Sequence, residues 1–279
     1  MTNGLMNGKR GLIMGVANDH SIAWGIAKTL AAEGAELAFT YQGEAFGRRV
    51  RPLAESVNAT TLIPCDVEDA ASLDNVFAVL KEKWGRLDFV VHAIAFSDKN
   101  ELKGRYAETT RANFVRTMVI SCFSFTEVAR RAAAMMPPGG AMVTLTYGGS
   151  TRVMPNYNVM GVAKAALESS VRYLAADFGE DGIRVNSISA GPVRTLAGAG
   201  VSDARLMFNY QKKNSPLRRT VTIDEIGKTA LYLLSDLSSG VTGEIHFVDS
   251  GYNIISMPRL DDLKVHDALD DEAGSQAAE

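Results

Sequence analysis

The sequence has few of the features that mark membrane, metal-binding or disulfide-bonded proteins. Its 279 residues include only two cysteines, Cys65 and Cys122, which lie far apart in apolar segments and fit buried reduced thiols better than a disulfide. The histidines and cysteines form no CxxC, HExxH or other metal-ligand spacing. No apolar run reaches the roughly 18 residues of a membrane helix, and the start, MTNGLMNGKRG, has no apolar signal-peptide segment. We therefore expect a cytoplasmic protein with no metal.

An excess of positive charge is also missing. The formal net charge is −3, but residues 261–279 hold seven acidic residues and one lysine, so residues 1–260 carry about +3. No basic stripe of the kind that binds nucleic acid is evident. Residues 261–279 show no helical apolar stripe, and we predict an acidic, disordered tail. No linker or repeat divides residues 1–260, which we expect to form a single domain.

The sequence does contain a regular alternation of strand and helix patterns. The fold that this alternation predicts is α/β: a Rossmann-type doubly wound sheet of seven mostly parallel strands, with helices on both faces. A long helical region is expected from about 106 to 135, between the fourth and fifth strands. The predicted strands, the sixth with its turn, cover residues 10–15, 35–42, 60–67, 87–96, 141–146, 182–195 and 243–254.

The turn after the first strand is typical of the start of a dinucleotide-binding unit. A strand leads through small residues into a helix, whose unpaired N–H groups can hold a pyrophosphate. The motif G-x-G-x-x-G is absent, however, and only Gly15 and Gly25 remain, with Ser21 near the helix N-cap. A tight turn that binds no ligand stays an alternative.

The second strand ends where such folds usually place a carboxylate for the adenosine ribose. This chain has Gln42 there, whose amide can also bond to ribose hydroxyls. No arginine directly follows the strand, which favours NAD over NADP. Arg48 and Arg49 lie about two turns into the next helix and leave NADPH open.

The third and fourth strands end in further candidate cofactor contacts. Asp66 can accept a hydrogen bond from an adenine amino group, cap the following helix, or do both. Residues 93–95, Ala-Ile-Ala, would let a flat cofactor lie against the backbone. His92 is interpreted as a buried core histidine rather than a catalyst.

Two tyrosines and a lysine follow the fifth strand. Tyr147 stands at its end, while Tyr157 and Lys164 belong to the long helix after Pro155. Seven residues make nearly two helical turns, so Tyr157 and Lys164 share a face, and the lysine leans back towards the tyrosine. Gly161 between them leaves that face open. A phenol and an ammonium at one cleft suit a reaction that builds negative charge on a substrate oxygen. A surface lysine with two packing tyrosines is the alternative.

Residues 196–220 interrupt the alternation of strands and helices. Small residues lead into a short amphipathic segment that contains Met207, Phe208 and Tyr210. We interpret residues 196–220 as a substrate lid that closes an apolar pocket and excludes water. A structured surface excursion is the alternative.

Taken in order, these segments resemble the bacterial NADH-dependent enoyl-acyl-carrier-protein reductases of the short-chain dehydrogenase superfamily. The resemblance covers about residues 5–257 and rests on GVANDHSIAWGIA, TYQ, CDV, HAIAF, YGGSTRVMPNYNVMGVAK and SAGPVRT, all in one register. Its most specific feature is the pattern Tyr-x9-Tyr-x6-Lys. Ordinary short-chain dehydrogenases have Tyr-x3-Lys, and Gly161 occupies that lysine's position here.

The resemblance implies reduction of trans-2-enoyl thioesters on acyl carrier protein by NADH, in bacterial type II fatty acid synthesis, by a homotetramer. Tyr157 would stabilise an enolate, Lys164 would bind the nicotinamide ribose, and Tyr147 would border the acyl pocket. The last strand, which looks buried, and its helix suit a subunit interface. Ser97 and Leu102 would lie near the substrate. The cofactor would also be lined by Gly15, Ser21, Ile22, Gln42, Asp66, Val67, Ile94, Val193, Arg194, Thr195, Leu196 and Ala197.

Two departures from the family and two rival functions remain. Ala95 stands where members often have glycine, and its methyl group is expected to crowd flat aromatic inhibitors. Ser202, Arg205 and Leu206 stand where relatives often carry more basic residues for docking the carrier protein. The rivals are a carbonyl-reducing short-chain dehydrogenase, which the lysine spacing disfavours, and a non-catalytic dinucleotide-binding regulator. Other basic candidates for carrier docking are Lys212, Lys213, Arg218 and Arg219.

Overall fold

The structure, a computed structural model, describes residues 4–193, 195 and 204–258. The predicted acidic tail, Arg194 and residues 196–203 of the predicted lid lie outside these residues. The strands are β1 Arg10–Met14, β2 Glu36–Tyr41, β3 Thr61–Pro64, β4 Phe89–His92, β5 Ala141–Thr146, β6 Arg184–Ala190 and β7 Ile245–Val248. The α-helices are α1 Ile22–Ala32, α2 Gly43–Ser56, α3 Ala70–Trp84, α4 Arg111–Met118, α5 Ser124–Ala133, α6 Asn158–Gly179, α8 Ala204–Asn214 and α9 Ile223–Leu234.

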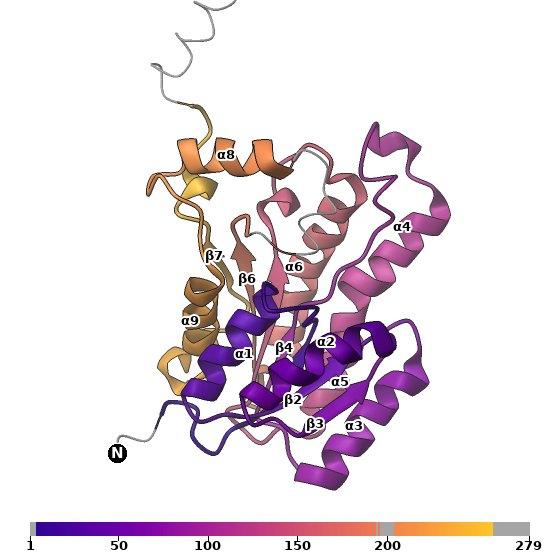
Figure 1. The fold of residues 1–279 in the computed structure, drawn as a ribbon, viewed down its shortest axis with the longest axis vertical. Helices are drawn as coiled ribbons and strands as arrows, with labels where there is room; N and C mark the ends of the chain where they lie inside the picture. The colour runs from indigo at the N-terminus through magenta and orange to yellow at the C-terminus, as the bar shows by residue number, and fades with distance from the viewer. Residues whose placement is uncertain (1–3, 194, 196–203, 259–279) are drawn as a thin grey trace, which may run out of the picture.

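The described strands form one parallel sheet in the order β3-β2-β1-β4-β5-β6-β7 (Figure 1). The order reverses between β1 and β4, and the pairing of Met14 with His92 brings the carboxyl ends of these two strands together. In open α/β sheets, ligands bind in the crevice outside the carboxyl ends at such a reversal. The predicted Rossmann-type fold is confirmed.

The sheet is covered on both faces by apolar helix surfaces. One core cluster joins the sheet to α1, α2 and α9, and the other joins it to α3, α5 and α6. Helices α1 and α9 approach closely at two glycines, since a Cβ on Gly25 would lie 2.6 Å from the Ile223 carbonyl oxygen and one on Gly227 would lie 2.7 Å from the Gly25 oxygen. Gly25, expected to belong to the nucleotide turn, therefore serves helix packing.

Three local expectations change in the structure. The long helical region is not uniform, because five residues, Val119–Phe123, form a π-helical turn (η2) between α4 and α5. Asp69, rather than Asp66, caps α3 by accepting from the Ala71 N–H at 3.0 Å. The last strand, β7, is a half-exposed edge strand rather than a buried one, with Phe247 41% exposed in the chain on its own.

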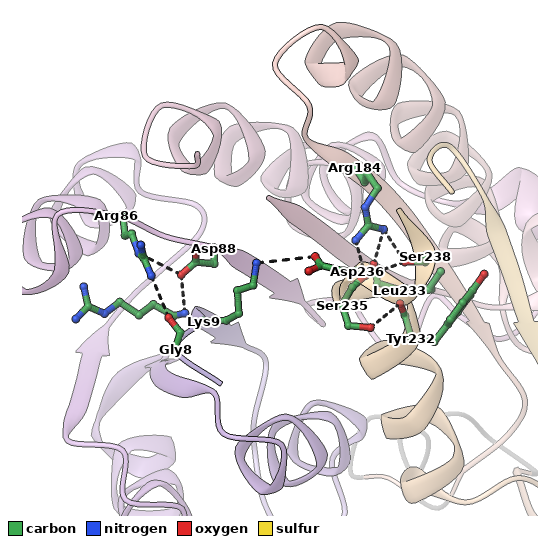
Figure 2. Close-up of polar contacts among 11 residues, drawn as sticks. Gly8, Lys9, Arg86, Asp88, Arg184, Tyr232, Leu233, Ser235, Asp236 and Ser238 are labelled. Carbon is green, nitrogen blue, oxygen red and sulfur yellow. Dashed lines mark hydrogen bonds and ion pairs between the residues drawn. The ribbon is translucent and has the colours of Figure 1, made fainter. Parts of the chain in front are cut away.

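The amino end of the sheet is closed by a polar network around Arg184, at the start of β6 (Figure 2). Arg184 is 8% exposed, and its guanidinium donates to the carbonyls of Leu233 and Ser235 at 2.7 and 3.0 Å, and to Ser238 Oγ at 2.7 Å. These acceptors lie at the C-terminal end of α9 and just beyond it, where helix carbonyls have no partners within the helix. Arg184 thus ties α9 to the sheet.

Candidate active site

A largely apolar cavity of about 410 Å³ lies at the carboxyl edge of the sheet, between β5, α6 and α8. Figure 1 shows α8 lying across this end of the sheet, above β6 and α6. The cavity brings together eight of the residues proposed from the sequence, although they come from distant parts of the chain. They are Ile22, Ser97, Leu102, Tyr147, Tyr157, Lys164, Val193 and Thr195.

The remaining described candidates do not line this cavity. They follow β1, β2, β3 and β4 and therefore lie along the same carboxyl edge, towards the nucleotide end of the crevice: Gly15, Ser21, Gln42, Asp66, Val67 and Ile94. Arg194, Leu196 and Ala197 lie outside the described residues.

Tyr147 and Tyr157 form an edge-to-face pair in the cavity wall. Their ring centroids are 5.2 Å apart at an interplanar angle of 72°. Burial raises the pKa of both phenols above the ordinary value of 10.0. Both hydroxyls are therefore neutral near pH 7 and can donate hydrogen bonds.

Glycines let the backbone pack tightly around Tyr157. A Cβ on Gly149 would lie 2.5 Å from the Tyr157 ring, and one on Gly161 would lie 2.7 Å from the Gly149 carbonyl oxygen. Gly161 was expected to keep the helix face open. It instead lets α6 pack against the turn that follows β5.

Lys164 is buried, at 6% exposure, and its ammonium donates to the Leu145 carbonyl oxygen at 2.8 Å. Loss of hydration lowers its pKa from 10.5 to about 8, while Cys122 and Glu168 act in the opposite direction. Glu168, one turn further along α6, accepts from Thr146 Oγ1 at 2.7 Å. This bond ties the end of β5, beside Tyr147, to the helix that carries Tyr157 and Lys164.

The turn after β1 fits a closely approaching nucleotide. Gly15 has φ +99°, and a Cβ there would lie 2.0 Å from the Ala93 carbonyl oxygen. Ser21 Oγ accepts from the N–H groups of Ala17 and Asn18 at 3.0 and 3.1 Å and so shapes the loop before α1. The Ser21 carbonyl accepts from the N–H groups of Trp24 and Gly25, but the Ser21 side chain makes no cap bond to the helix. The N–H groups of Ile22 and Ala23, which precede these, therefore suit an anion.

The ends of β2 and β3 are joined by polar side chains. Gln42 Nε2 donates to Asp66 Oδ2 at 3.1 Å. Asp66 also accepts from the Glu68 N–H at 3.0 Å through its other oxygen. An amide and a carboxylate held together at this edge suit the hydroxyls and amino group of an adenosine. The donor set therefore fits a dinucleotide.

The loop after β4 is held from behind by α4 and the π-helical turn. Ser121 Oγ bonds to both the N–H and the carbonyl of Phe96, at 2.9 and 3.0 Å. Thr117 donates to Ser97 at 2.9 Å. Single π-helical turns are frequent at functional sites, and this one places Ser121 under the loop. Ala95, one of the expected departures, lines the cavity from the same loop.

The histidine assignment agrees with the sequence-based interpretation. His92 is fully buried, its ring nitrogens contact Thr144 and Ser124 at 3.2 and 2.9 Å, and burial lowers its pKa to about 3. Within the part of the chain that the structure describes, no three His, Cys, Asp or Glu side chains form a group that could hold a metal ion. No described helix is long and apolar enough to cross a membrane.

Sequence reasoning missed several residues of the site. Met160 lines the cavity, and its position three residues after Tyr157 on α6 would have indicated this. Glu168 lies four residues after Lys164 on the same face of α6, so the same spacing would have indicated it. Gln211, on α8, donates from Nε2 to the Tyr147 hydroxyl at 2.9 Å. No sequence pattern pointed to this contact, because the two residues are 64 positions apart.

The fold and the site together define a Rossmann-type dinucleotide-binding protein with a tyrosine and lysine cavity at the carboxyl edge of its sheet. Residues 15–253 match the family model described as Enoyl-(Acyl carrier protein) reductase. The chain belongs to this enoyl-acyl-carrier-protein reductase family.

Individual relatives agree with the family match. The chain is 77% identical over 266 residues to enoyl-[acyl-carrier-protein] reductase [NADH] 2 of Rhizobium meliloti, covering 95% of this chain and 99% of the relative. The structure of FabI from Candidatus Liberibacter asiaticus matches with a TM-score of 0.90 and 64% identity, covering 92% of this chain and 99% of that one. The Anaplasma phagocytophilum reductase, solved in complex with NAD, matches with a TM-score of 0.90 and 59% identity, covering 93% and 99%.

Proposed function

We propose that this protein reduces the trans-2 double bond of enoyl-[acyl-carrier-protein] thioesters with NADH, in the elongation cycle of bacterial type II fatty acid synthesis. The observation that carries the proposal is the convergence of Tyr147, Tyr157 and Lys164 on one apolar cavity. Support comes from the 77% identity to a named NADH-dependent reductase.

NADH, when bound, supplies the hydride for this reaction. Lys164 and the residues at the ends of the strands would hold it. Gly15 and the free N–H groups of α1 suit the pyrophosphate, and Gln42 with Asp66 suits the adenosine. Ile94, Val67 and Val193 would supply apolar contacts beside the bases.

Tyr157 is the proposed donor to the thioester oxygen. Hydride addition at C3 of the enoyl group builds negative charge on the thioester oxygen. A neutral phenol stabilises this charge only as it appears. Burial raises the pKa of this phenol, so it keeps its proton at neutral pH. The apolar lining excludes water, which strengthens the hydrogen bond.

Lys164 is the proposed anchor for the nicotinamide ribose. Its single hydrogen bond among the described residues, to Leu145, leaves two further ammonium donors for a ligand. Glu168, buried nearby on the same helix, favours the charged form of the ammonium. The cation would also favour the enolate electrostatically.

The two rival functions fit the site less well. In a carbonyl-reducing short-chain dehydrogenase a lysine would stand four residues after Tyr157, and Gly161 there packs against Gly149 instead. A non-catalytic regulator would not need Tyr157, Lys164 and an apolar cavity to be kept together. Substrate assays separate the three functions.

We also propose that α8 is part of a substrate lid and that the protein acts in the cytoplasm. Met207 and Phe208 of α8 form part of the cavity wall, which supports the lid. The acyl carrier protein would dock near α8. Arg219 is paired with Glu225 at 2.6 Å, so exposed Arg205 and Lys212 are the better candidates for contacting an acidic partner.

A homotetramer is the proposed assembly. Apolar side chains are exposed on α4, the π-helical turn and the neighbouring helix α6, with Val115 and Phe123 each 53% exposed and Tyr173 72% exposed. The half-exposed edge strand β7 offers a second surface. Single exposed apolar residues are normal, so the support for an interface is that these residues lie on elements that pack together, since α6 contacts both α4 and the π-helical turn. Analytical ultracentrifugation would test the assembly, and a monomeric sedimentation coefficient at micromolar concentration would contradict it.

The decisive assay follows NADH oxidation with crotonyl-CoA and with crotonyl-carrier protein. We expect turnover that depends on both reactants and yields the saturated thioester. An acetoacetyl thioester serves as the control, and its reduction in place of crotonyl-CoA would indicate the carbonyl-reducing rival. Binding of NADH by a folded protein that turns over neither enoyl substrate would support the regulator and end the proposal.

A further inference from the structure

We propose that Gln211 is a positioning residue that aims the hydroxyl of Tyr147 into the substrate cavity. The inference rests on the proposed enoyl reduction and deepens it, because it gives a role to an amide on α8 and a sharper role to Tyr147. It concerns contacts across the cavity wall that neither residue's position in the sequence suggests.

The contact itself is short and sheltered. Gln211 Nε2 donates to Tyr147 Oη at 2.9 Å. The Gln211 side chain is buried, at 5% exposure, while its neighbours on α8, Tyr210 and Lys212, are exposed. A glutamine side chain is seldom buried without a bonded partner, since burying an unpaired amide is unfavourable. Tyr147 provides that partner.

The bond decides where the Tyr147 hydrogen can point. A phenol oxygen has one hydrogen and two acceptor positions. When Gln211 donates to one acceptor position, the hydroxyl hydrogen is directed away from the amide. Tyr147 lines the substrate cavity of about 410 Å³ beside Tyr157 and, together with Gln211, a second cavity of about 40 Å³. A hydrogen directed away from the amide therefore has the substrate cavity as its larger open side. A hydroxyl that accepts one bond also becomes a better donor in the next.

Gln211 also makes this orientation depend on the placement of α8. The same helix supplies Met207 and Phe208 to the cavity wall, and just beyond its C-terminal end the Leu217 N–H donates to the Ser250 carbonyl oxygen at 3.3 Å, which holds this end against the segment after β7. The same helix, α8, therefore covers the cavity and orients the Tyr147 hydroxyl. We infer that Tyr147 acts as a second donor near the thioester oxygen only while α8 is seated.

A role in packing alone would predict something different. If Gln211 only filled space between α8 and β5, its loss would lower stability and would change kcat by the same factor with or without the Tyr147 hydroxyl. If it positions that hydroxyl, its loss has no further effect once the hydroxyl is gone. A double-mutant cycle separates these cases.

The test measures kcat and KM with crotonyl-CoA, and NADH affinity, for Gln211→Met, Tyr147→Phe and the double variant. Loss of one neutral hydrogen bond predicts a fall of about 3- to 10-fold in kcat for Gln211→Met, with NADH affinity unchanged. In the Tyr147→Phe background the same substitution should change kcat less than about twofold, within the error of additivity. Asn209→Met, on the exposed side of α8, is the matched control and should match the parent.

Gln211→Glu gives an independent readout with no change in length. An ionised carboxylate only accepts hydrogen bonds, so it would capture the Tyr147 hydrogen, whereas the protonated acid can donate. We expect kcat below that of Gln211→Met at neutral pH, and a rise relative to Gln211→Met as the pH falls towards the carboxyl pKa.

Two results would overturn the inference: an unchanged kcat in a folded Gln211→Met or Gln211→Glu variant, or an equal loss in the Tyr147→Phe background. Both leave the proposed reaction intact, because the parent protein still reduces crotonyl-CoA. Absence of turnover in the parent protein would instead remove the proposed function itself.

Discussion

Lys164 and Arg184 are both buried cations, at 6% and 8% exposure, but they lie at opposite ends of the sheet and are satisfied very differently. Arg184, at the amino end, donates to two carbonyls and a hydroxyl within 3.0 Å (Figure 2). Lys164, at the carboxyl end, makes one hydrogen bond among the described residues, to Leu145. Burial of charge therefore does not by itself mark a site.

The difference in hydrogen bonding distinguishes a structural buried cation from one that is available to a ligand. Fixed acceptors around a buried guanidinium replace part of the hydration that the cation loses on burial. An ammonium with spare donors in an apolar cavity has fewer such acceptors. Burial lowers the pKa of both groups, that of Lys164 to about 8, so the difference between them lies in their hydrogen bonds. The shortage of acceptors at Lys164 is relieved when a ligand with hydroxyl groups binds. We therefore expect the same substitution to have opposite effects at the two ends of the sheet.

The largest effect is expected for Tyr157→Phe, which tests whether the carboxyl end is specialised for reaction rather than stability. Removing the donor to a developing oxyanion should lower kcat with crotonyl-CoA by about 100- to 1,000-fold. NADH affinity and Tm should stay near the parent values, because the ring and its contact with Tyr147 remain. A variant that keeps the parental kcat would show that another group stabilises the charge.

Arg184→Met should act on stability alone. It leaves the carbonyls of Leu233 and Ser235 and the Ser238 hydroxyl without their donor, and we expect a loss of about 2–4 kcal/mol in the free energy of unfolding. Denaturant titration measures the loss. At a temperature where the variant is folded, NADH affinity should be unchanged, and a selective fall in affinity would break the comparison with Lys164.

Lys164→Met should show the reverse pattern. NADH affinity should fall by about 10- to 100-fold, since hydrogen bonds to a charged donor contribute roughly 1.5–3 kcal/mol. Tm should not fall, because the substitution removes a buried charge with incomplete partners. Calorimetry of NADH binding and thermal unfolding tests both halves. A large drop in Tm would mean that Lys164 is structural, as Arg184 is.

The smallest effect is the pH dependence of NADH binding. The pKa of Lys164 is lowered to about 8 in the folded, free protein. Its charge is therefore present below that pH, at an energetic penalty, and is lost as the pH rises through it. We expect the Kd for NADH to be level below pH 8 and to rise by up to about tenfold per unit above it. Lys164→Arg, which keeps its charge, should give a level profile, and an equally steep rise in that variant would assign the titration elsewhere.

Much of the fold could be predicted from local patterns. Each expected strand contains an observed one, and their parallel pairing followed from the alternation with helices. The exceptions have tertiary causes. The π-helical turn at Val119–Phe123 places Ser121 beneath Phe96, and β7 looks buried in sequence but forms an edge of the sheet. The type of a residue indicates neither which distant residue it will contact nor whether its strand will form the edge of the sheet.

The site divides in the same way. Tyr157 and Lys164 could be placed on one helix face because helical geometry depends only on their spacing. Helical spacing would equally have found Met160 and Glu168. The role of Gly161 could not be predicted, since it depends on the Gly149 carbonyl oxygen, which would lie 2.7 Å from a Cβ at that position. Asp66 could be offered as a possible helix cap, while Asp69 is the observed one, because both residues suit a cap by type.

The Rossmann-type fold, the carboxyl edge of the sheet as the candidate site and the common helix face of Tyr157 and Lys164 could be predicted from the sequence, because each depends on short-range periodicity. Tertiary packing set which buried polar groups have hydrogen-bond partners. It gave Arg184 three close acceptors and Lys164 one, and it brought Gln211 to Tyr147 across 64 residues of chain. Hydrogen bonding depends on distance and direction in space, and those are set only when the sheet and its helices have packed together.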